Sequence, residues 1–440
     1  PDFSLQTTRT AAELRAAPEH VRLEAYEKLR TADFPLSTAF DLWQEQTRIF
    51  LQHLGVPRWE LMEAFQLPEV PGVPAVPPAP AAPPVPPVPT DTSIAGEYWG
   101  MSTHETAIVV ATNDNTDARQ KVYWGISDAA IPTEMSVADF MRRSSLTYKD
   151  LLELLYVQWI NPIGDANNLA IERPDATCDT ELQKVVKLNA DRLDKIHRLL
   201  RLRQYVGWSM WKIDLLIRSA AIGNGSLNEG CLVRMMQVAR LQRRLGLPVD
   251  RMLALFGDIN TEARVTPDRP TQPIPSLYAE LFQNLAVVNP VDVAFGLPIA
   301  AGMHIADADP NLDHRRTLLA AFALTAADLE RLQTKLPNNE LNLANLSKLG
   351  RYAWLARGLG ISIKELLALE SLSGAADIFA TPKATLDFIE SADWVTKSPF
   401  RIDELDYLLR VIPGSAIGLR EEVITQYIET LRQALRADRT

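Results

Sequence analysis

The sequence is poor in cysteine and histidine, the side chains that most often bind metals or form cross-links. Its 440 residues include two cysteines and six histidines. Cys178 and Cys231 lie far apart and form no C-x-x-C motif, so we predict two buried or partly buried thiols and no disulfide framework. No two histidines have metal-ligand spacing, and we expect each on a helix surface or partly buried: His20, His53, His104, His197, His304 and His314.

Long apolar runs are also missing. No stretch reaches the roughly 18 apolar residues that a membrane-spanning helix needs. The chain begins at Pro1 without an initiating Met or a signal peptide, and it stops at Thr440 just after a predicted helix. We therefore interpret it as a piece of a longer protein.

Catalytic motifs are absent as well: no H-E-x-x-H, G-x-S-x-G, P-loop or G-x-G-x-x-G pattern occurs. The glycine-rich segment Gly223–Gly230 lacks a preceding strand and a lysine, and we interpret it as a loop between helices. Asn113–Asp117 resembles the start of a calcium loop but lacks the required glycine and final acid. Glu421 and Glu422 fall at a predicted helix start, where the helix dipole favours acids. We predict no catalytic, cofactor-binding or metal-binding residue, no cofactor, and a protein that is not an enzyme.

There is no excess of positive charge. The net charge of −10 argues against a nucleic-acid or anionic-membrane binder. One predicted helix carries five basic residues, which we interpret as a solvated face: Arg192, Lys195, Arg198, Arg201 and Arg203.

Proline is concentrated rather than scarce. Ten prolines lie between Pro71 and Pro89, where neither a helix nor an inner strand can form. We expect polyproline II or a surface loop there. An SH3-type ligand is the alternative, although the basic flanking residues of such ligands are missing. Two further stretches, 161–179 and 258–310, are predicted to be irregular.

The remaining sequence has helical periodicity. With 47% apolar residues the chain can build a core. One apolar face is predicted from Phe40, Trp43, Thr47, Phe50, Leu51 and Leu54, and similar stripes run through 188–205, 232–245, 343–359 and 423–435. No stretch alternates convincingly with period two. The apolar run 106–111 is the best strand candidate, but a repeat explains it better.

A repeat recurs eight times. Each copy has an apolar residue, then a capping-type residue or proline, two variable residues, and commonly an acid followed by an apolar run. The second positions are Pro57, Ser102, Thr147, Ser209, Pro248, Thr325, Ser362 and Arg401, at intervals of 45, 45, 62, 39, 77, 37 and 39 residues. The two long intervals contain the irregular stretches.

The residues around these positions predict where helices stop and start. Hydroxyl side chains at five of them can accept hydrogen bonds from the free amides of a new helix, and an acid follows three residues later at Glu105, Asp150, Asp328 and Glu365. Glycines just before, which end helices, are Gly55, Gly100, Gly246 and Gly360. The unit is a long helix, a glycine, a cap and a short helix. Stacked units predict an all-α, α-solenoid-like fold of helical hairpins with irregular Pro-rich loops.

This pattern divides the chain into five predicted parts. They are an N-terminal helical segment at 1–70, a Pro-rich loop or linker at 71–93, helical repeats at 94–257, an irregular Pro-rich insertion at 258–311, and helical repeats at 312–440.

Several longer phrases resemble the A component (TcA) of bacterial insecticidal toxin complexes, the Tc toxins. The resembling blocks are 25–55, 139–162, 277–295 and 341–369, followed by FRIDELDYLLR at 400–410. The resemblance implies the N-terminal part of an α-helical shell in a large, secreted or cell-surface homopentamer. Such a subunit binds host cells, responds to pH, and delivers a toxic enzyme carried by a B–C cocoon. The Pro-rich stretch is longer than the family pattern.

Three functions remain open from the sequence. The leading hypothesis is a structural scaffold segment of a pore-forming, translocating toxin A subunit. The alternative is an α-solenoid recognition module for a host receptor, a glycan or a partner toxin protein. The third, an undetected hydrolase, has no motif in its favour, and the Asp-box of neuraminidases is absent.

Overall fold

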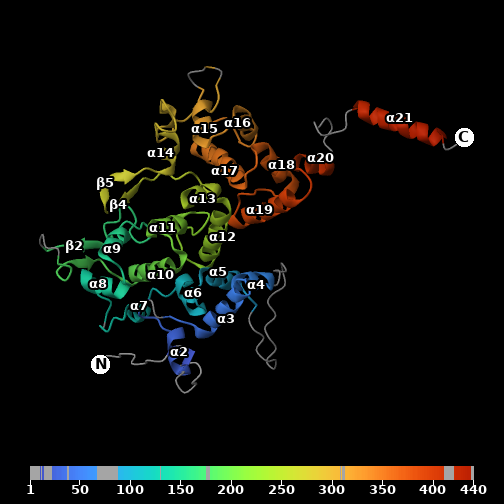
Figure 1. Cartoon of the computed structure of the whole chain (residues 1–440). Helices are drawn as coiled ribbons and strands as arrows, with labels where there is room; N and C mark the ends of the chain where they lie inside the picture. The colour runs from blue at the N-terminus through green and yellow to red at the C-terminus, as the bar shows by residue number, and fades with distance from the viewer. Residues whose placement is uncertain are drawn as a thin grey trace. The chain divides into compact units, whose positions relative to one another are not determined.

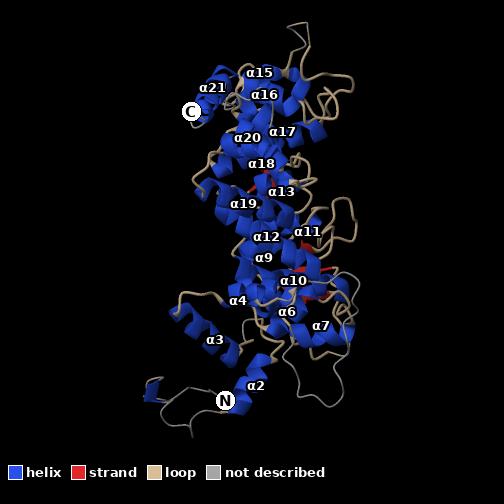
Figure 2. Ribbon diagram, turned by 90° about the vertical axis from the view of Figure 1, so that its right-hand side faces the viewer, coloured by secondary structure: helices blue, strands red, loops and turns tan. Residues whose placement is uncertain are grey.

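The protein is a mostly helical chain, as the computed structural model shows (Figure 2). The structure describes residues 10, 12–13, 22–36, 39–66, 88–128, 130–174, 179–307, 309, 313–410 and 421–437. The predicted all-α fold class is confirmed. His20, Cys178 and most of the Pro-rich stretch, 67–87, lie outside the described residues.

The chain forms two compact units. Unit 1 comprises Pro1–Met236 and Arg264–Ile274, and unit 2 comprises Gln237–Ala263 and Pro275–Thr440. The division falls within helix α12 (Glu229–Leu245). The five-part segmentation stays a prediction, although α5 already begins at Asp91, inside the predicted linker, because Thr90 caps it.

In the described residues, unit 1 contains the ten helices α2 to α11, five short strands and the start of α12. The helices are α2 (Leu23–Arg30), α3 (Leu42–His53), α4 (Arg58–Ala64), α5 (Asp91–Trp99), α6 (Thr103–Val110), α7 (Asp117–Trp124), α8 (Val137–Ser144), α9 (Tyr148–Leu154), α10 (Ala190–Val206) and α11 (Met210–Arg218). The strands are β1 (Glu134–Ser136), β2 (Ala170–Glu172), β3 (Lys184–Val186), β4 (Arg264–Thr266) and β5 (Arg269–Ile274).

Unit 2 consists of helices and turns in the part of the chain that the structure describes. They are α13 (Val249–Phe256), α14 (Leu277–Phe282), the 3-10 turn η2 (Val293–Phe295), α15 (Arg315–Phe322), α16 (Ala326–Gln333), α17 (Leu343–Leu359), α18 (Ile363–Ser373), α19 (Pro382–Lys397), α20 (Ile402–Arg410) and α21 (Glu421–Ala437).

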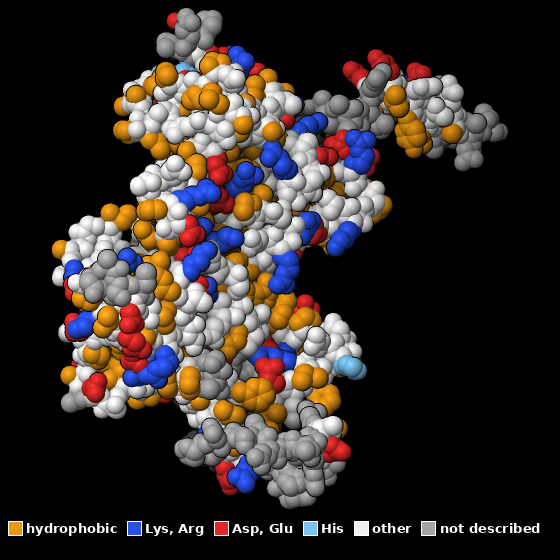
Figure 3. All heavy atoms as spheres, turned by 60° about the vertical axis from the view of Figure 1, so that its left-hand side comes forward, with side chains coloured by type: hydrophobic (Ala, Val, Ile, Leu, Met, Phe, Trp, Pro, Cys, Tyr) orange, Lys and Arg blue, Asp and Glu red, His pale blue; other side chains and the backbone are white. Residues whose placement is uncertain are grey.

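On the face seen in Figure 3, basic and acidic side chains are interspersed, which fits the modest net charge.

The predicted repeat corresponds to real helix starts. A short helix begins directly after each of the eight capping positions: α4, α6, α9, α11, α13, α16, α18 and α20. The run 106–111 lies within α6 and its C-cap, so it is helical as predicted. The four predicted long stripes are also helices, namely α10, α12, α17 and α21.

The caps work as the sequence predicts, with one exception. Ser102, Thr147 and Ser362 form capping boxes with the acids three residues later, and Thr325 accepts a hydrogen bond from the amide of Asp328. The hydroxyl of Ser209 makes no cap bond. Gly55, Gly100, Gly246 and Gly360 have φ between 68° and 79°, the left-handed conformation that ends a helix.

Long helices supply the cores of both units. In α10 the buried apolar side chains include Leu193, Ile196 and Leu199, and in α17 they include Leu349 and Trp354. Figure 1 shows α10 beside α6 and α7, and residues of these helices are in contact. Because the buried stripes follow helical spacing, the apolar side chains stabilise each helix against its neighbours.

The sequence analysis missed two small sheets. The strands β1, β3 and β2 form an antiparallel sheet in that order, and β4 pairs with β5 in a hairpin. Four of the five strands have three residues, which is too short for an alternating pattern to be visible. The stretches predicted to be irregular, 161–179 and 258–311, therefore contain β2, the hairpin, α14 and η2.

The apolar face predicted for residues 40–54 is not buried. The predicted apolar face of α3 exists, but no residue of α3 is buried, and Phe50 and Leu54 are 73% and 74% exposed. The helix is attached instead through its polar side chains Gln44 and Arg48, which contact Glu97. The apolar spacing identified the helix but not the side by which it is attached.

The caps give the first testable prediction. Replacing Thr147 by Ala removes a cap bond to the amide of Asp150 and is expected to lower the free energy of unfolding by about 1 kcal/mol. Ser209→Ala is the matched control in the same unit; because its hydroxyl makes no cap bond, the change should stay below about 0.5 kcal/mol. Urea denaturation measures both. Equal losses for the two variants would contradict the capping role.

Candidate functional site: a polar network at the α5–α6 break

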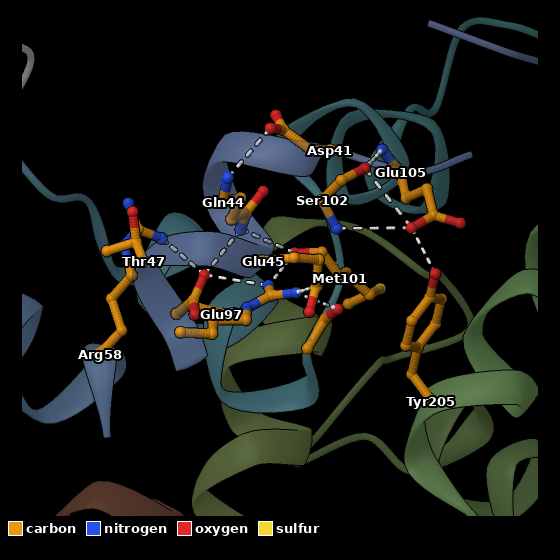
Figure 4. A network of polar contacts seen from close by, with 12 residues as sticks. Asp41, Gln44, Glu45, Thr47, Arg58, Glu97, Met101, Ser102, Glu105 and Tyr205 are labelled. Atoms are coloured by element: carbon orange, nitrogen blue, oxygen red, sulfur yellow. Dashed lines mark hydrogen bonds and ion pairs between the residues drawn. The ribbon is translucent and has the colours of Figure 1, made fainter. Parts of the chain in front are cut away.

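A network of polar contacts in unit 1 surrounds the break between α5 and α6 (Figure 4). Helix α5 ends at Gly100 with φ 79°, and Ser102 caps α6 through its capping box with Glu105. The two helices approach closely: a Cβ on Gly96 would lie 2.3 Å from Oγ1 of Thr106. Glycine at position 96 is therefore required by the packing of α5 on α6.

Glu97, on the last turn of α5, is the acceptor on which the network converges. Its side chain is 3% exposed. Arg48 of α3 donates from Nε and Nη2 at 2.8 Å and 3.0 Å, and Arg58 of α4 donates at 2.6 Å. Gln44 adds a bond of 2.7 Å. One buried carboxylate thus holds three helices together.

Arg48 also completes the end of α5. Its Nη1 donates to the carbonyl oxygen of Gly100 at 2.9 Å, and its Nη2 donates to that of Met101 at 2.8 Å. These carbonyls belong to the C-cap residue and the residue after it, which lie beyond the helical hydrogen bonds of α5, so Arg48 supplies donors to them. The remaining charge of Arg48 is balanced by Glu45, one turn away on α3.

The environment keeps Glu97 ionised. Burial opposes ionisation, but hydrogen bonds from Arg48 and Gln44 and the charges of Arg48 and Arg58 outweigh it and lower the pKa of Glu97. A carboxylate with a lowered pKa and several donors already bound is a poor proton acceptor. The arrangement is suited to holding helices in place rather than to acid–base chemistry.

On the other side of the break, the cap of α6 is tied to α10. The hydroxyl of Tyr205 donates to Glu105, the acid of the capping box, and Nη1 of Arg201 lies 3.6 Å from the same carboxylate. Arg201 is fully buried, and its Nη2 donates to the carbonyl of Asp33. Burial, together with the bond and charge of Glu105, raises the pKa of Tyr205, so it stays a neutral donor.

His197 lies next to Arg201 in the interior of unit 1. Its ring is fully buried, stacks on Tyr123 at 4.4 Å between centroids, and accepts a hydrogen bond from Nε of Arg201 at 3.0 Å. Because Nε2 accepts, the proton of the neutral ring resides on Nδ1. Burial, together with the charges of Arg201 and Arg198, lowers the pKa of His197 well below its ordinary value.

The predicted solvated basic face is wrong for two of its five residues. Arg198 is 6% exposed and Arg201 is fully buried. Arg198 donates to Asp194 at 2.9 Å and to the carbonyl of Leu227 at 2.7 Å. The others reach acids nearer the surface, with Arg192 near Asp165, Lys195 near Asp191, and Arg203 bonded to Asp150. Arg198 and Arg201 can be buried because acceptors accompany them, Asp194 of the same helix for Arg198 and Glu105 of α6 for Arg201.

Two cavities flank the Arg58–Glu97 pair. One, of about 460 Å³, is lined by Trp59, Tyr98 and Trp99 among others, and the second, of about 500 Å³, lies toward Met62 and Thr106. The aromatic rings continue in a row from Trp59 to Tyr98, Trp99 and Trp208, with successive centroids 5.0–5.3 Å apart. Because the charged groups lining the first cavity already bind one another, it offers no uncompensated charge to a ligand.

The other singled-out residues are dispersed. His53 and His304 are exposed, whereas His104 contacts Asp33 at 2.9 Å and His314 contacts Asp292 at 2.7 Å. The prediction of surface or partly buried histidines is thus wrong for His197 and His314, which are buried. The thiol of Cys231 is buried as predicted, and burial raises its pKa to about 12.

The structure also places the glycine-rich segment, the segment that resembles a calcium loop, and the two glutamates predicted at a helix start. Segment Gly223–Gly230 lies between α11 and α12 as a helix-to-helix connection, apart from its end, which enters α12. In Asn113–Asp117, Asp114 accepts a bond from the Tyr123 hydroxyl at 2.6 Å and Thr116 caps α7. Glu421 and Glu422 form the first turn of α21, as predicted.

Among the described residues, no cluster of three or more His, Cys, Asp or Glu side chains is arranged to hold a metal ion. None of the helices within the described ranges is long and apolar enough to cross a membrane.

The sequence analysis did not single out Glu97, and it did not predict that Glu105, Arg198 and Arg201 take part in buried polar contacts. Glu97 stands in an otherwise apolar turn, and Arg198 and Arg201 stand among leucines, with Asp194 and Tyr205 at helical spacing on the same side of α10. The sequence did carry a signal for these residues, because they are charged and stand at positions where their neighbours are apolar. Their partners were not predictable, since Glu105 and Tyr205 are 100 positions apart.

The network gives a prediction about Glu97. Glu97→Gln leaves two partly buried guanidinium groups without their shared carboxylate, so we expect a loss of about 2 kcal/mol in the free energy of unfolding. Glu45→Gln, the control, removes only a partly exposed partner of Arg48 and should cost about 0.5 kcal/mol or less. Urea denaturation at pH 7 compares them. An E97Q variant as stable as the E45Q control would show that the network does not stabilise the unit.

The neutral state of His197 predicts acid sensitivity. Since its pKa is lowered in the folded state, the unfolded chain binds more protons as the pH falls below about 6.5, so folding stability decreases from there downward. His197→Gln keeps an acceptor for Arg201 but cannot titrate. The difference in unfolding free energy between wild type and H197Q, measured from pH 7.5 to 5, should change by about 1 kcal/mol or more. A difference that is independent of pH would contradict this account.

Comparison with known proteins yields a match in fold but not in sequence family. No family model matches the sequence, and no curated protein matches it. The cryo-EM structure of TcdA4 from Morganella morganii matches with a TM-score of 0.58 and 13% identity, over 90% of this chain and 21% of that chain. TcaA–TcaB from Yersinia pseudotuberculosis matches with a TM-score of 0.35 and 18% identity, over 52% of this chain and 13% of that chain. The chain thus spans about a fifth of the length of TcdA4, and its fold is similar to part of that Tc toxin component, as the sequence resemblance predicted.

Proposed function

We propose that this chain is a structural scaffold segment of a large Tc toxin A-type subunit. The observation that carries the proposal is that the buried charges of unit 1 hold helix ends together: Glu97 and Arg48 join α3, α4 and α5, and Glu105 joins α6 to α10. Such an arrangement gives rigidity and leaves little reactivity at these groups. The similarity of fold to part of TcdA4 supports the same role.

The finer functions follow from the resemblance and belong to the whole protein. We propose that the complete subunit is secreted or displayed on the bacterial surface, assembles as a homopentamer, and forms a pore that delivers a toxic enzyme carried by a B–C cocoon into host cells. Within it, this segment would form part of the helical shell and have no catalytic role. It would need no cofactor and no nucleic acid.

A recognition role is the second candidate, and the exposed apolar face of α3 favours it. Trp43, Phe50 and Leu54 are 42%, 73% and 74% exposed, and they share one side of the helix. Exposed apolar patches often mark protein-binding surfaces. A neighbouring subunit, a partner toxin protein or a host receptor would bury this face.

The test uses the full-length protein. Light scattering and electron microscopy should find a large homo-oligomer, and Glu97→Gln should lower the temperature at which it dissociates or unfolds, without changing the subunit number. A monomer that turns over a substrate, with turnover abolished by one substitution that leaves folding intact, would overturn the scaffold.

The two candidates are separated by a surface variant. Phe50→Glu combined with Leu54→Glu alters exposed side chains, so folding should be preserved. If α3 is a recognition surface, binding to cells or to the partner should fall about tenfold or more while assembly persists. Unchanged binding would leave the scaffold as the only supported role.

A further inference from the structure

The C-terminal helix α21 carries an apolar stripe that nothing described covers. The stripe consists of Val423, Ile424, Tyr427, Ile428 and Leu431, which are 43–67% exposed. At 100° per residue they fall within an arc of about 140°. Figure 3 shows hydrophobic side chains gathered along this helix. The helix is thus built to pack against something.

Length alone gives α21 little stability. The helix has 17 residues, only slightly more than the roughly 12–15 below which isolated helices are marginal in water even in alanine-rich sequences. In proteins, most of the stability of such a helix comes from packing its apolar face. A stable α21 therefore requires a partner for its stripe.

Helix α20, the preceding short helix, has a complementary exposed surface. Its apolar side is buried at Ile402, which is 7% exposed, and uncovered at its C-terminal end, where Leu408 and Leu409 are 56% and 69% exposed. Residues of α20 contact α18. One part of its apolar side is thus used by the preceding repeat, and the other is free for a further helix.

The repeat indicates which helix belongs there. Three other long helices, α10, α12 and α17, also have 17 residues, and each comes after one of the short helices of the repeat along the chain. In unit 2, α17 packs on α16 and α19 packs on α18. By its length and its place after α20, α21 corresponds to the long helix of the next repeat.

We propose that α21 folds back on α20 of its own chain and buries its stripe on Leu408 and Leu409. The occupant of this surface is therefore an intramolecular helix. Only ten residues separate the two helices in the sequence, so each helix meets the other at an effective concentration well above that of a second copy in dilute solution. In an antiparallel pair the residues nearest the connection meet first, which places Leu408 next to Ile424.

The composition of α21 argues against a membrane as the occupant. Membrane-surface helices usually have a polar face rich in Lys and Arg. Helix α21 instead begins with Glu421 and Glu422, and its polar side also carries Glu429. Because these acids would be repelled by anionic lipids, a protein surface is the better partner. The inference rests on the helix repeat and not on the proposed toxin role.

Disulfide cross-linking tests the proposal in the complete chain. In a background with Cys178→Ser and Cys231→Ala, the pair Leu408→Cys and Ile424→Cys should oxidise to an intramolecular disulfide in a glutathione buffer. The matched control is Leu408→Cys with Thr425→Cys, which has nearly the same chain separation but lies on the polar side of α21. We expect the first pair to close about tenfold faster or more, since disulfides require Cβ atoms close to one another.

Each outcome has a defined meaning. Faster closure of the first pair, independent of protein concentration, supports the proposal. Equal rates would show that α21 does not present its stripe to α20 and would overturn it. Disulfide-linked dimers through position 424 would overturn it in favour of a second copy. Faster closure at position 424 only when phosphatidylcholine–phosphatidylglycerol vesicles are present would overturn it in favour of a lipid surface.

If the cysteine background unfolds, Tyr427→Glu and Glu429→Gln are compared by hydrogen exchange in the native chain. Loss of protection in residues 402–410 only with Y427E supports the docking, and no loss overturns it.

Discussion

The fold depends on how each long helix is ended and the next short helix begun. A buried helix end exposes carbonyl and amide groups that need hydrogen-bond partners. Here glycines with positive φ end α12 and α17, and Ser or Thr side chains cap four of the short helices, α6, α9, α16 and α18. Where the break between α5 and α6 is packed under α3, Arg48 supplies donors to the carbonyls of Gly100 and Met101. The chain can reverse direction at each break because these groups have partners.

The same break explains why charged residues are buried. Glu97 belongs to the last turn of α5, and Glu105 belongs to the first turn of α6, so the two helices place both residues at the break. Arg48, Arg58 and Arg201 then reach them from other helices. Removing one member of such a set leaves a buried charge without compensation. We infer that these groups determine which helices pack together, while the apolar stripes supply most of the stabilising burial.

Whether a structural feature could be predicted from the sequence depends on how far apart along the chain the interacting residues lie. Caps such as Ser362 with Glu365, and the limits of α17, depend on residues within one or two turns, and the sequence predicted them correctly. The solvated face assigned to α10 was wrong because the partners of Arg201 come from distant segments. The short strands had too few residues to show a period.

The site was less predictable than the fold for the same reason. Nothing in the sequence near Glu97 identifies Arg48 or Arg58 as its partners, because the contacts span 49 and 39 positions. The exposed face of α3 was predicted as a stripe, but its exposure depends on the polar residues that attach the helix. Which side of an amphipathic helix is buried is decided by such long-range contacts.

Hydrogen exchange of the native protein tests the central claim most directly, because it measures how strongly each helix is held by its neighbours. We expect the slowest-exchanging amides in α10, α12 and α17, with protection that falls in the connections between repeats and in the short strands. If the strands or the connections exchanged most slowly, or if α10 and α17 exchanged as freely as loops, stacked capped helices would not be the source of this protein's stability.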